Sequence, residues 1–200
     1  MTTGLTYGIL IYEQVAELDF VGPLQVFGIS NHLLNSGRVV TIGQANNPLR
    51  GTGGLQMIPD YSFDVAPKLD VLLLPGTAEI SEYALGNDTI IDWVRGQYDK
   101  VDWMTSVCTG GLILQKAGLL KGRKATTHWM LMDSLAKDPE VTALSDLRYV
   151  RDGNIVTAQG VSAGIDMALW LVGEIHSPDH ARMVRKILQY DPAPPYTAEV

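Results

Sequence analysis

The segment DWMTSVCTGGLILQKA, residues 102–117, decides the fold because it predicts a strand, a sharp turn and a helix in direct succession. Residues 102–107 are rich in apolar and β-favouring types, and residues 110–117 carry apolar side chains at helical spacing. The turn between them holds Cys108, which is the single cysteine of the chain.

Predicted strands and helices alternate along the chain on both sides of this segment. The strands are expected at residues 7–12, 38–43, 70–76, 102–107 and 124–127. The helices are expected at residues 16–34, 88–98, 110–117, 163–175 and 178–190. Gly22 and Pro23 predict a disturbance or restart within the first helix.

Two further segments complete the predicted sheet. Residues 147–159 are expected to form a hairpin, because Asp152-Gly153 separates two alternating runs, and residues 53–63 an edge hairpin or loop. Near-continuous apolar strands that alternate with helices predict an α/β fold whose mostly parallel sheet is covered on both faces. A ligand site is then expected at the carboxyl ends of the strands.

Composition indicates one soluble domain over residues 1–200, with an extended proline-rich tail from about residue 191. The net charge of −7 and the scattered basic residues argue against a nucleic-acid or anionic-membrane partner. The amino terminus lacks a basic stretch ahead of its short apolar run, so no signal peptide or membrane span is predicted. A single cysteine makes no disulfide framework, and the cytoplasm is the expected location.

Cys108 is a candidate nucleophile. Ser106 and Gly110 flank it in the small-x-nucleophile-x-small pattern of a nucleophile elbow, in which small neighbours permit a sharp turn. The amino terminus of the following helix is expected to favour its thiolate. The alternative is a buried cysteine with a structural role, which is common for this residue type.

A rival elbow at residues 160–164 matches G-x-S-x-G around Ser162. The acid and histidine of an α/β-hydrolase would have to follow it, and the residues after it predict two helices and a proline-rich tail. Ser162 is therefore expected to cap the helix that starts at Ala163.

Two histidines and one acid are further candidates for site residues. His176 and His180 have the spacing of paired ligands, but Ser177-Pro178 between them predicts a helix start, and no third ligand is evident. No metal and no other cofactor is predicted. Asp19, close behind the first strand, is either a helix-start charge or a site residue.

Several segments together resemble the ThiJ/PfpI family of the class I glutamine amidotransferase-like superfamily. They are ELDFVGPLQVF, LDVLLLPG, TSVCTGGLILQKAGLLKGRKATTHW, VRDGNIVTAQGVSAGIDMAL and LQYDPAPPY. The resemblance runs in order over nearly the whole chain, and it is greatest to the branch that hydrates isocyanides (isonitriles). It implies a flavodoxin-like three-layer sandwich, a homodimer and a small-molecule substrate.

The resemblance also implies roles for individual residues. The nucleophile of the family falls on Cys108, and the acid that reaches toward its sulfur falls on Asp19. Thr109 is expected to offer its N–H and hydroxyl to the substrate, and Gly76 and Thr77 to supply facing N–H donors.

Three positions depart from other members of the family. Thr109 stands where peptidase-like members have histidine, and Asp19 stands where deglycase-related members have glutamate. Thr77 stands where a second glycine is expected, so the pocket wall beside it is expected to differ.

The implied reaction is the hydration of an isocyanide to an N-substituted formamide. Cys108 attacks the terminal carbon while Asp19 delivers a proton, and water then releases the formamide from the thioimidate. A shared proton, with Asp19 neutral, would avoid repulsion between the two groups.

Two alternatives stay open. One is another thiol activity of the fold, of glyoxalase, deglycase or amidase type, with His128 as the base. A packing or polar-network role near the site is favoured for His128. The other is a redox sensor in which Cys108 is oxidised. The sensor half of a transcription regulator is disfavoured, because no helix-turn-helix segment follows.

Overall fold

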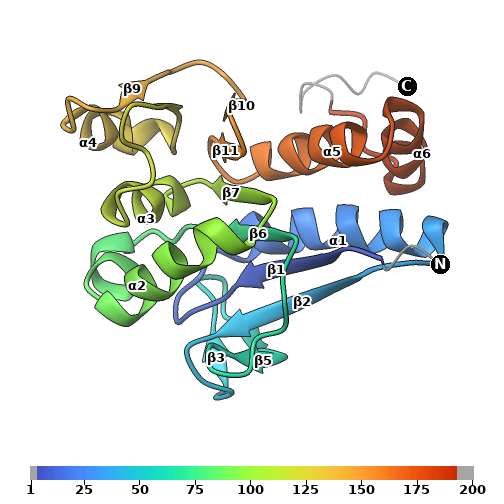
Figure 1. Cartoon of the computed structure of the whole chain (residues 1–200), viewed down its shortest axis with the longest axis horizontal. Helices are drawn as coiled ribbons and strands as arrows, with labels where there is room; N and C mark the ends of the chain where they lie inside the picture. Colours follow the sequence, from blue (N-terminus) through green and yellow to red (C-terminus); the bar gives the residue numbers. More distant parts are fainter. Residues whose placement is uncertain (1–3, 193–200) are drawn as a thin grey trace.

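A mostly parallel seven-stranded sheet is the frame of this computed structural model, which describes residues 4–192 (Figure 1). The strand order is β10-β11-β7-β6-β1-β2-β5. β10 pairs antiparallel with β11, and the other neighbours pair in parallel. The strands are β1 (Thr6–Leu10), β2 (Arg38–Gly43), β5 (Tyr61–Ser62), β6 (Val71–Leu74), β7 (Trp103–Val107), β10 (Tyr149–Asp152) and β11 (Ile155–Ala158).

Helices cover both faces of this sheet, which gives three layers (Figure 1). α1 (Glu17–Leu34), α5 (Ala163–Ile175) and α6 (Pro178–Leu188) pack against one another on one face. α2 (Asp88–Gln97) and α3 (Gly110–Lys116) lie on the other face. The predicted flavodoxin-like α/β sandwich is therefore confirmed.

Shorter elements lie at the edges. They are β3 (Leu49–Arg50), β4 (Gln56–Met57), β8 (Lys124–Ala125), β9 (Thr142–Ala143), α4 (Met132–Ala136), the π-helical turn η1 (Ser81–Leu85), and the 3-10 turns η2 (Tyr98–Lys100) and η3 (Trp129–Leu131). Sequence reasoning did not predict η1, η3 or α4, because each is too short to show a period.

The central strands explain the sequence pattern. Every residue of β1, β6 and β11 is buried, because helices cover both sides of the sheet. Tyr7 of β1 stacks on Phe27 of α1 with ring centroids 4.4 Å apart. The continuous apolar runs in the sequence therefore arise because both faces of these strands are buried.

Some predicted details were wrong. α1 runs on through Gly22 and Pro23 without a restart, and the Pro23 ring packs beside Gly164 of α5, which favours the continuous helix. The strand expected at 124–127 is only β8, which pairs with β9 and not with the main sheet. Of residues 53–63, the β4 part pairs with β3, and β5 extends the main sheet beside β2.

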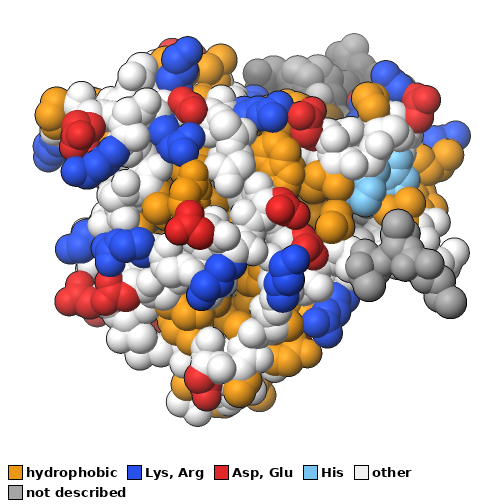
Figure 2. Space-filling model, viewed as in Figure 1, with side chains coloured by type: hydrophobic (Ala, Val, Ile, Leu, Met, Phe, Trp, Pro, Cys, Tyr) orange, Lys and Arg blue, Asp and Glu red, His pale blue; other side chains and the backbone are white. Residues whose placement is uncertain are grey.

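Acidic and basic side chains are interspersed over the face shown in Figure 2, in keeping with the scattered charges of the sequence. None of the helices in residues 4–192 has both the length and the apolar character that crossing a membrane would require. The tail expected from about residue 191 lies almost wholly outside the described residues.

Candidate active site

Cys108 occupies the strand-to-helix turn that follows β7. Its backbone is left-handed, with φ of 58°, a conformation that non-glycine residues rarely adopt and that costs about 1 kcal/mol or more. Its N–H donates to the carbonyl of Gln159 at 2.7 Å, and its own carbonyl accepts from the Thr127 hydroxyl at 2.8 Å. The sharp turn predicted from the sequence is thus present and is held from two sides.

The surroundings of Gly110 explain why the elbow needs a small residue two positions after Cys108. A Cβ on Gly110 would stand 2.9 Å from both the carbonyl carbon of Leu74 and the carbonyl oxygen of Pro75, so α3 and the end of β6 approach too closely for a side chain.

Asp19 lies in the first turn of α1 and is completely buried. One carboxylate oxygen, Oδ2, accepts the Gly76 N–H at 2.9 Å, and Oδ1 has no hydrogen-bond partner of standard geometry within residues 4–192. Burial raises the pKa of Asp19 to about 6, although the Gly76 N–H and the Cys108 thiol both act to lower it. Of the two roles left open for Asp19, the structure supports the second, because its carboxyl group interacts with the thiol.

The Cys108 thiol is neutral at physiological pH. Burial, together with the charge of Asp19, raises its pKa to about 12, although the N–H groups of Thr109 and Val161 act to lower the pKa. The Thr109 N–H at the start of α3 thus favours the thiolate as expected, but desolvation and the neighbouring carboxylate outweigh this effect. Cys108 and Asp19 therefore form a coupled pair that holds one proton near neutral pH.

Thr109 closes the turn opposite the thiol. Its hydroxyl donates to the Thr77 carbonyl and accepts the Thr77 N–H, each at 2.9 Å. The N–H of Gly76 is bound to Asp19. The Thr109 hydroxyl and these two facing N–H groups thus have partners within the protein, and their expected contacts with a substrate stay a prediction.

Val161 is a site residue that sequence reasoning missed. It follows β11 with a left-handed φ of 46°, and its N–H faces the Cys108 thiol and acts to lower the thiol pKa. The signal was the G-x-S-x-G segment, where the strained residue is the one before the serine. We expected the Ser162 side chain to cap α5, and this was wrong. Its hydroxyl makes no capping hydrogen bond and instead accepts one from Arg148 at 3.1 Å.

Tyr12 was also missed. It lies just beyond β1, and its buried hydroxyl donates to the Pro75 carbonyl at 2.8 Å, next to Gly76. Burial raises its pKa well above 10, and the charges of Asp19 and Cys108 add to this, so the phenol stays neutral and near the pair. A polar side chain at the carboxyl end of a predicted strand was the available signal.

His128 lies beside the site. Its Nδ1 accepts the Met130 N–H at 3.4 Å, and a Cβ on Gly160 would meet its ring at 2.7 Å. No hydrogen bond joins His128 to Cys108 among the described residues. Its ring therefore packs against the turn that presents Val161.

No group of three or more potential metal ligands occurs within residues 4–192. The rings of His176 and His180 lie 5.4 Å apart, but their Nε2 atoms are hydrogen-bonded to Tyr7 and Ser30. Ser177 caps α6 between them, as its sequence predicts.

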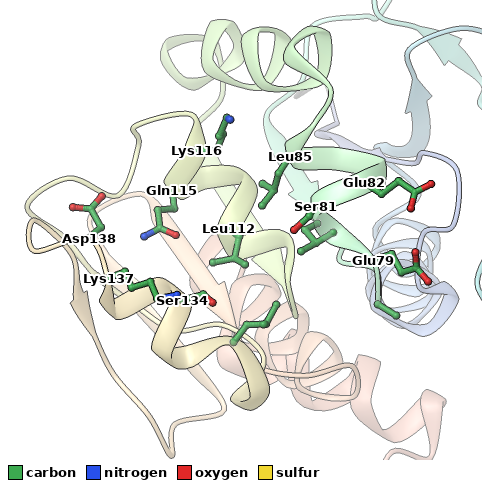
Figure 3. A pocket seen from close by; sticks show the side chains of 13 residues that line it. Glu79, Ser81, Glu82, Leu85, Leu112, Gln115, Lys116, Ser134, Lys137 and Asp138 are labelled. Atoms are coloured by element: carbon green, nitrogen blue, oxygen red, sulfur yellow. The ribbon is translucent and has the colours of Figure 1, made fainter.

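A cleft of about 720 Å³ lies next to the site, and Figure 3 shows it from close by. Glu79 and Glu82 lie on one side, Lys137 and Asp138 on the other, and Leu112 of α3 between them. Cys108 and Asp19 do not line this cleft. It adjoins the thiol only through the first turn of α3.

The fold and the site together define a class: flavodoxin-like α/β proteins with a cysteine at a strand-to-helix elbow and a buried acid beside it. The chain belongs to the DJ-1/PfpI family, whose family model matches residues 8–174. This confirms the resemblance inferred from the sequence motifs.

Individual relatives differ in what they do. The chain is 39% identical over 193 residues to isonitrile hydratase of Pseudomonas putida, covering 96% of this chain and 81% of that protein. It is 24% identical to the HTH-type transcriptional regulator GbdR of Pseudomonas aeruginosa, of which it spans only 50%. A ThiJ/PfpI family crystal structure from Pseudomonas syringae superposes with a TM-score of 0.88 at 32% identity, covering 98% of this chain and 79% of that one.

Proposed function

We propose that this protein is an isocyanide (isonitrile) hydratase that converts an isocyanide and water to an N-substituted formamide. The observation that carries the proposal is the buried pair of Cys108 and Asp19, which holds one proton between a nucleophile and an acid. The 39% identity to a relative named isonitrile hydratase supports the same reaction.

The first step forms a bond between the sulfur and the terminal isocyanide carbon. The Cys108 thiol gives its proton to Asp19, and Asp19 passes that proton to the same carbon, which leaves a neutral thioimidate, R–N=CH–S. Because the thiol pKa is high, proton transfer must accompany the attack.

The second step adds water to the thioimidate carbon. Asp19 takes a proton from the water and passes it to the nitrogen, so that the carbon carries a hydroxyl group, the sulfur and the amine nitrogen. The C–S bond then breaks, the hydroxyl proton returns to the pair, and the formamide leaves. The sum is isocyanide plus water, with the thiol regenerated.

The backbone around the pair supplies electrostatic support. The N–H groups of Thr109 and Val161 interact with the sulfur and offset negative charge on it during attack and release. The closed Thr77–Thr109 contact fixes the loop from which Gly76 holds Asp19.

The two alternatives have less support. A cysteine and histidine hydrolase would need an imidazole on the thiol, and His128 bonds to η3 instead. A redox sensor works best with an exposed thiolate, whereas Cys108 is buried and its pKa is raised.

The test is direct: purified protein is mixed with an aryl isocyanide, and formamide formation is followed by ultraviolet absorbance. Catalytic turnover supports the proposal. A folded protein with a reduced thiol and no turnover of aryl or alkyl isocyanides contradicts it.

Substitution of Gly76 by alanine should lower kcat/KM about a hundredfold. The new Cβ would lie 2.6 Å from the Thr109 nitrogen and 3.0 Å from Asp19 Oδ2. It would therefore displace the N–H and the carboxylate that interact with the Cys108 thiol. Gly28→Ala is the matched control, because a Cβ there meets nothing within 4 Å and α1 gains helix propensity. Equal activity of Gly76→Ala and wild type would show that the loop geometry does not matter.

We also propose that the protein acts as a homodimer. Exposed apolar side chains lie near the site: Leu18 of α1 is 46% exposed, Val21 37% and Val161 36%. The side chains of Leu18 and of Ile165 in α5 both lie close to Gly22, so Leu18 and Ile165 are neighbours. Light scattering should give twice the 21.8 kDa chain mass, and Leu18→Glu should shift it toward the monomer. A wild-type monomer at micromolar concentration would contradict the dimer.

The remaining proposals follow from the same features. The cytoplasm is the proposed location, because a reducing compartment keeps a single catalytic thiol reduced. A small-molecule substrate is the proposed partner, and the net charge of −7 with interspersed basic residues supports neither a nucleic-acid nor a membrane partner.

A further inference from the structure

A polar network lies behind the strained turn that presents Val161. The Arg148 guanidinium donates from Nε to Asp166 Oδ2 at 2.7 Å and from Nη2 to the Ser162 hydroxyl at 3.1 Å. The other carboxylate oxygen of Asp166 accepts the Tyr190 hydroxyl at 3.1 Å. One arginine thus joins the residue after Val161 to α5.

The backbone of the same arginine reaches the nucleophile. Its carbonyl accepts the Gln159 N–H at 2.9 Å, and the Gln159 carbonyl accepts the Cys108 N–H at 2.7 Å. Arg148 therefore contacts both flanks of the Gly160–Val161 turn, one through its main chain and the other through its side chain.

The turn needs such support because its conformation is costly. A β-branched residue such as Val161 is rarely found at a φ of 46°, and this strain persists only where the surroundings hold it. Backbone hydrogen bonds from Ala163 to the Gly160 carbonyl at 3.0 Å and from Gly164 to the Val161 carbonyl at 3.1 Å join the turn to α5, so contacts that fix the start of α5 also fix the turn. The Val161 side chain is also 36% exposed, so core packing alone does not hold it in place.

We infer that Arg148, with Asp166, is a positioning residue that fixes the Val161 N–H against the Cys108 sulfur. The inference rests on the proposed hydratase function for its kinetic consequence, and on the contacts above for its structural one. Arg148 does not touch the reacting atoms and acts through Ser162 and Gln159.

The chain offers a matched control. Arg151 and Glu174 form a second ion pair between β10 and α5, at 2.9 Å, and their exposed fractions of 46% and 39% resemble the 51% and 25% of Arg148 and Asp166. Among the described residues, no hydrogen bond or ion pair joins the side chains of this pair to residues 159–162. Arg151 also packs over Trp103, so its removal takes away a cation–π contact as well as an ion pair.

The first measurement is amide hydrogen exchange of residues 161–165 in full-length wild type, Arg148→Met and Arg151→Met. Arg148→Met should raise the exchange rate of this segment about tenfold or more, Arg148→Lys should give an intermediate rate because it keeps the charge without the planar fork, and Arg151→Met should leave it unchanged. Unchanged exchange in Arg148→Met, or an equal increase in Arg151→Met, would overturn the inference.

The second measurement is steady-state kinetics with the aryl isocyanide. Arg148→Met should lower kcat about tenfold with KM within about twofold of wild type. The displaced Val161 N–H would no longer stabilise the negative charge that builds on the sulfur during the reaction. A change in KM alone, or the same kcat loss in Arg151→Met, would refute a positioning role. If wild type shows no turnover but the exchange result holds, the hydratase proposal fails while the structural role of Arg148 stands.

Discussion

Replacing Cys108 with alanine should abolish isocyanide hydration, lowering kcat by at least about 10³-fold. The thioimidate cannot form without the sulfur, and within residues 4–192 Cys108 is the only thiol. Formamide production by the variant, measured at high enzyme concentration, should match the background without protein. Residual turnover within tenfold of wild type would exclude covalent catalysis by Cys108.

The control for this variant is Ser106→Ala. Ser106 lies two residues before Cys108 on β7, and its buried hydroxyl has no hydrogen-bond partner in the described part of the chain. Its removal changes the same strand by one atom and leaves no broken bond, so kcat should stay within about twofold of wild type. A comparable loss in both variants would trace the effect to distortion of β7 and not to the thiol.

Asp19→Asn should lower kcat about 10²- to 10⁴-fold, the range that general acid–base catalysis supplies. The amide can still accept the Gly76 N–H, but it cannot carry the thiol proton to the isocyanide carbon. In wild type, kcat/KM should fall as pH drops below about 6. A second proton on the pair then protonates Asp19, which can no longer accept the proton of the Cys108 thiol. Hydration by Asp19→Asn at the wild-type rate would remove Asp19 from the mechanism.

Two further measurements on Asp19→Asn show that lost activity is not lost structure or lost reactivity. The carboxylate raises the pKa of the Cys108 thiol, so its removal should speed alkylation by iodoacetamide at pH 8 severalfold. Slower alkylation would mean that the two groups are not coupled.

Stability provides the second measurement. The pKa of Asp19 is about 6 in the folded protein and 3.8 without it, so the folded state binds the proton more tightly and wild type loses stability as pH rises through this interval. At pH 8, Asp19→Asn should therefore be more stable than wild type by up to about 3 kcal/mol, with little difference at pH 3. A less stable variant at pH 8 would contradict the burial of a charged carboxylate.

Local patterns in the sequence determined the architecture and the place of the nucleophile. Strand, cysteine and helix follow one another within residues 102–117, and each is set by side-chain periodicity over a few residues. The same reasoning gave α5 its observed bounds, because a long apolar helix has a strong period. Asp19 and Cys108 were predicted together only through family resemblance, since nothing local links their positions.

The tertiary structure alone decided the chemistry of the pair. The parallel arrangement of β1, β6 and β7 brings their carboxyl ends together, and the burial that follows raises the pKa of both Asp19 and Cys108. It also decided that Thr109 bonds to Thr77 and that Val161 faces the sulfur. Desolvation and hydrogen-bond partners depend on segments that are distant in sequence, so a short motif can name a nucleophile but cannot give its protonation state.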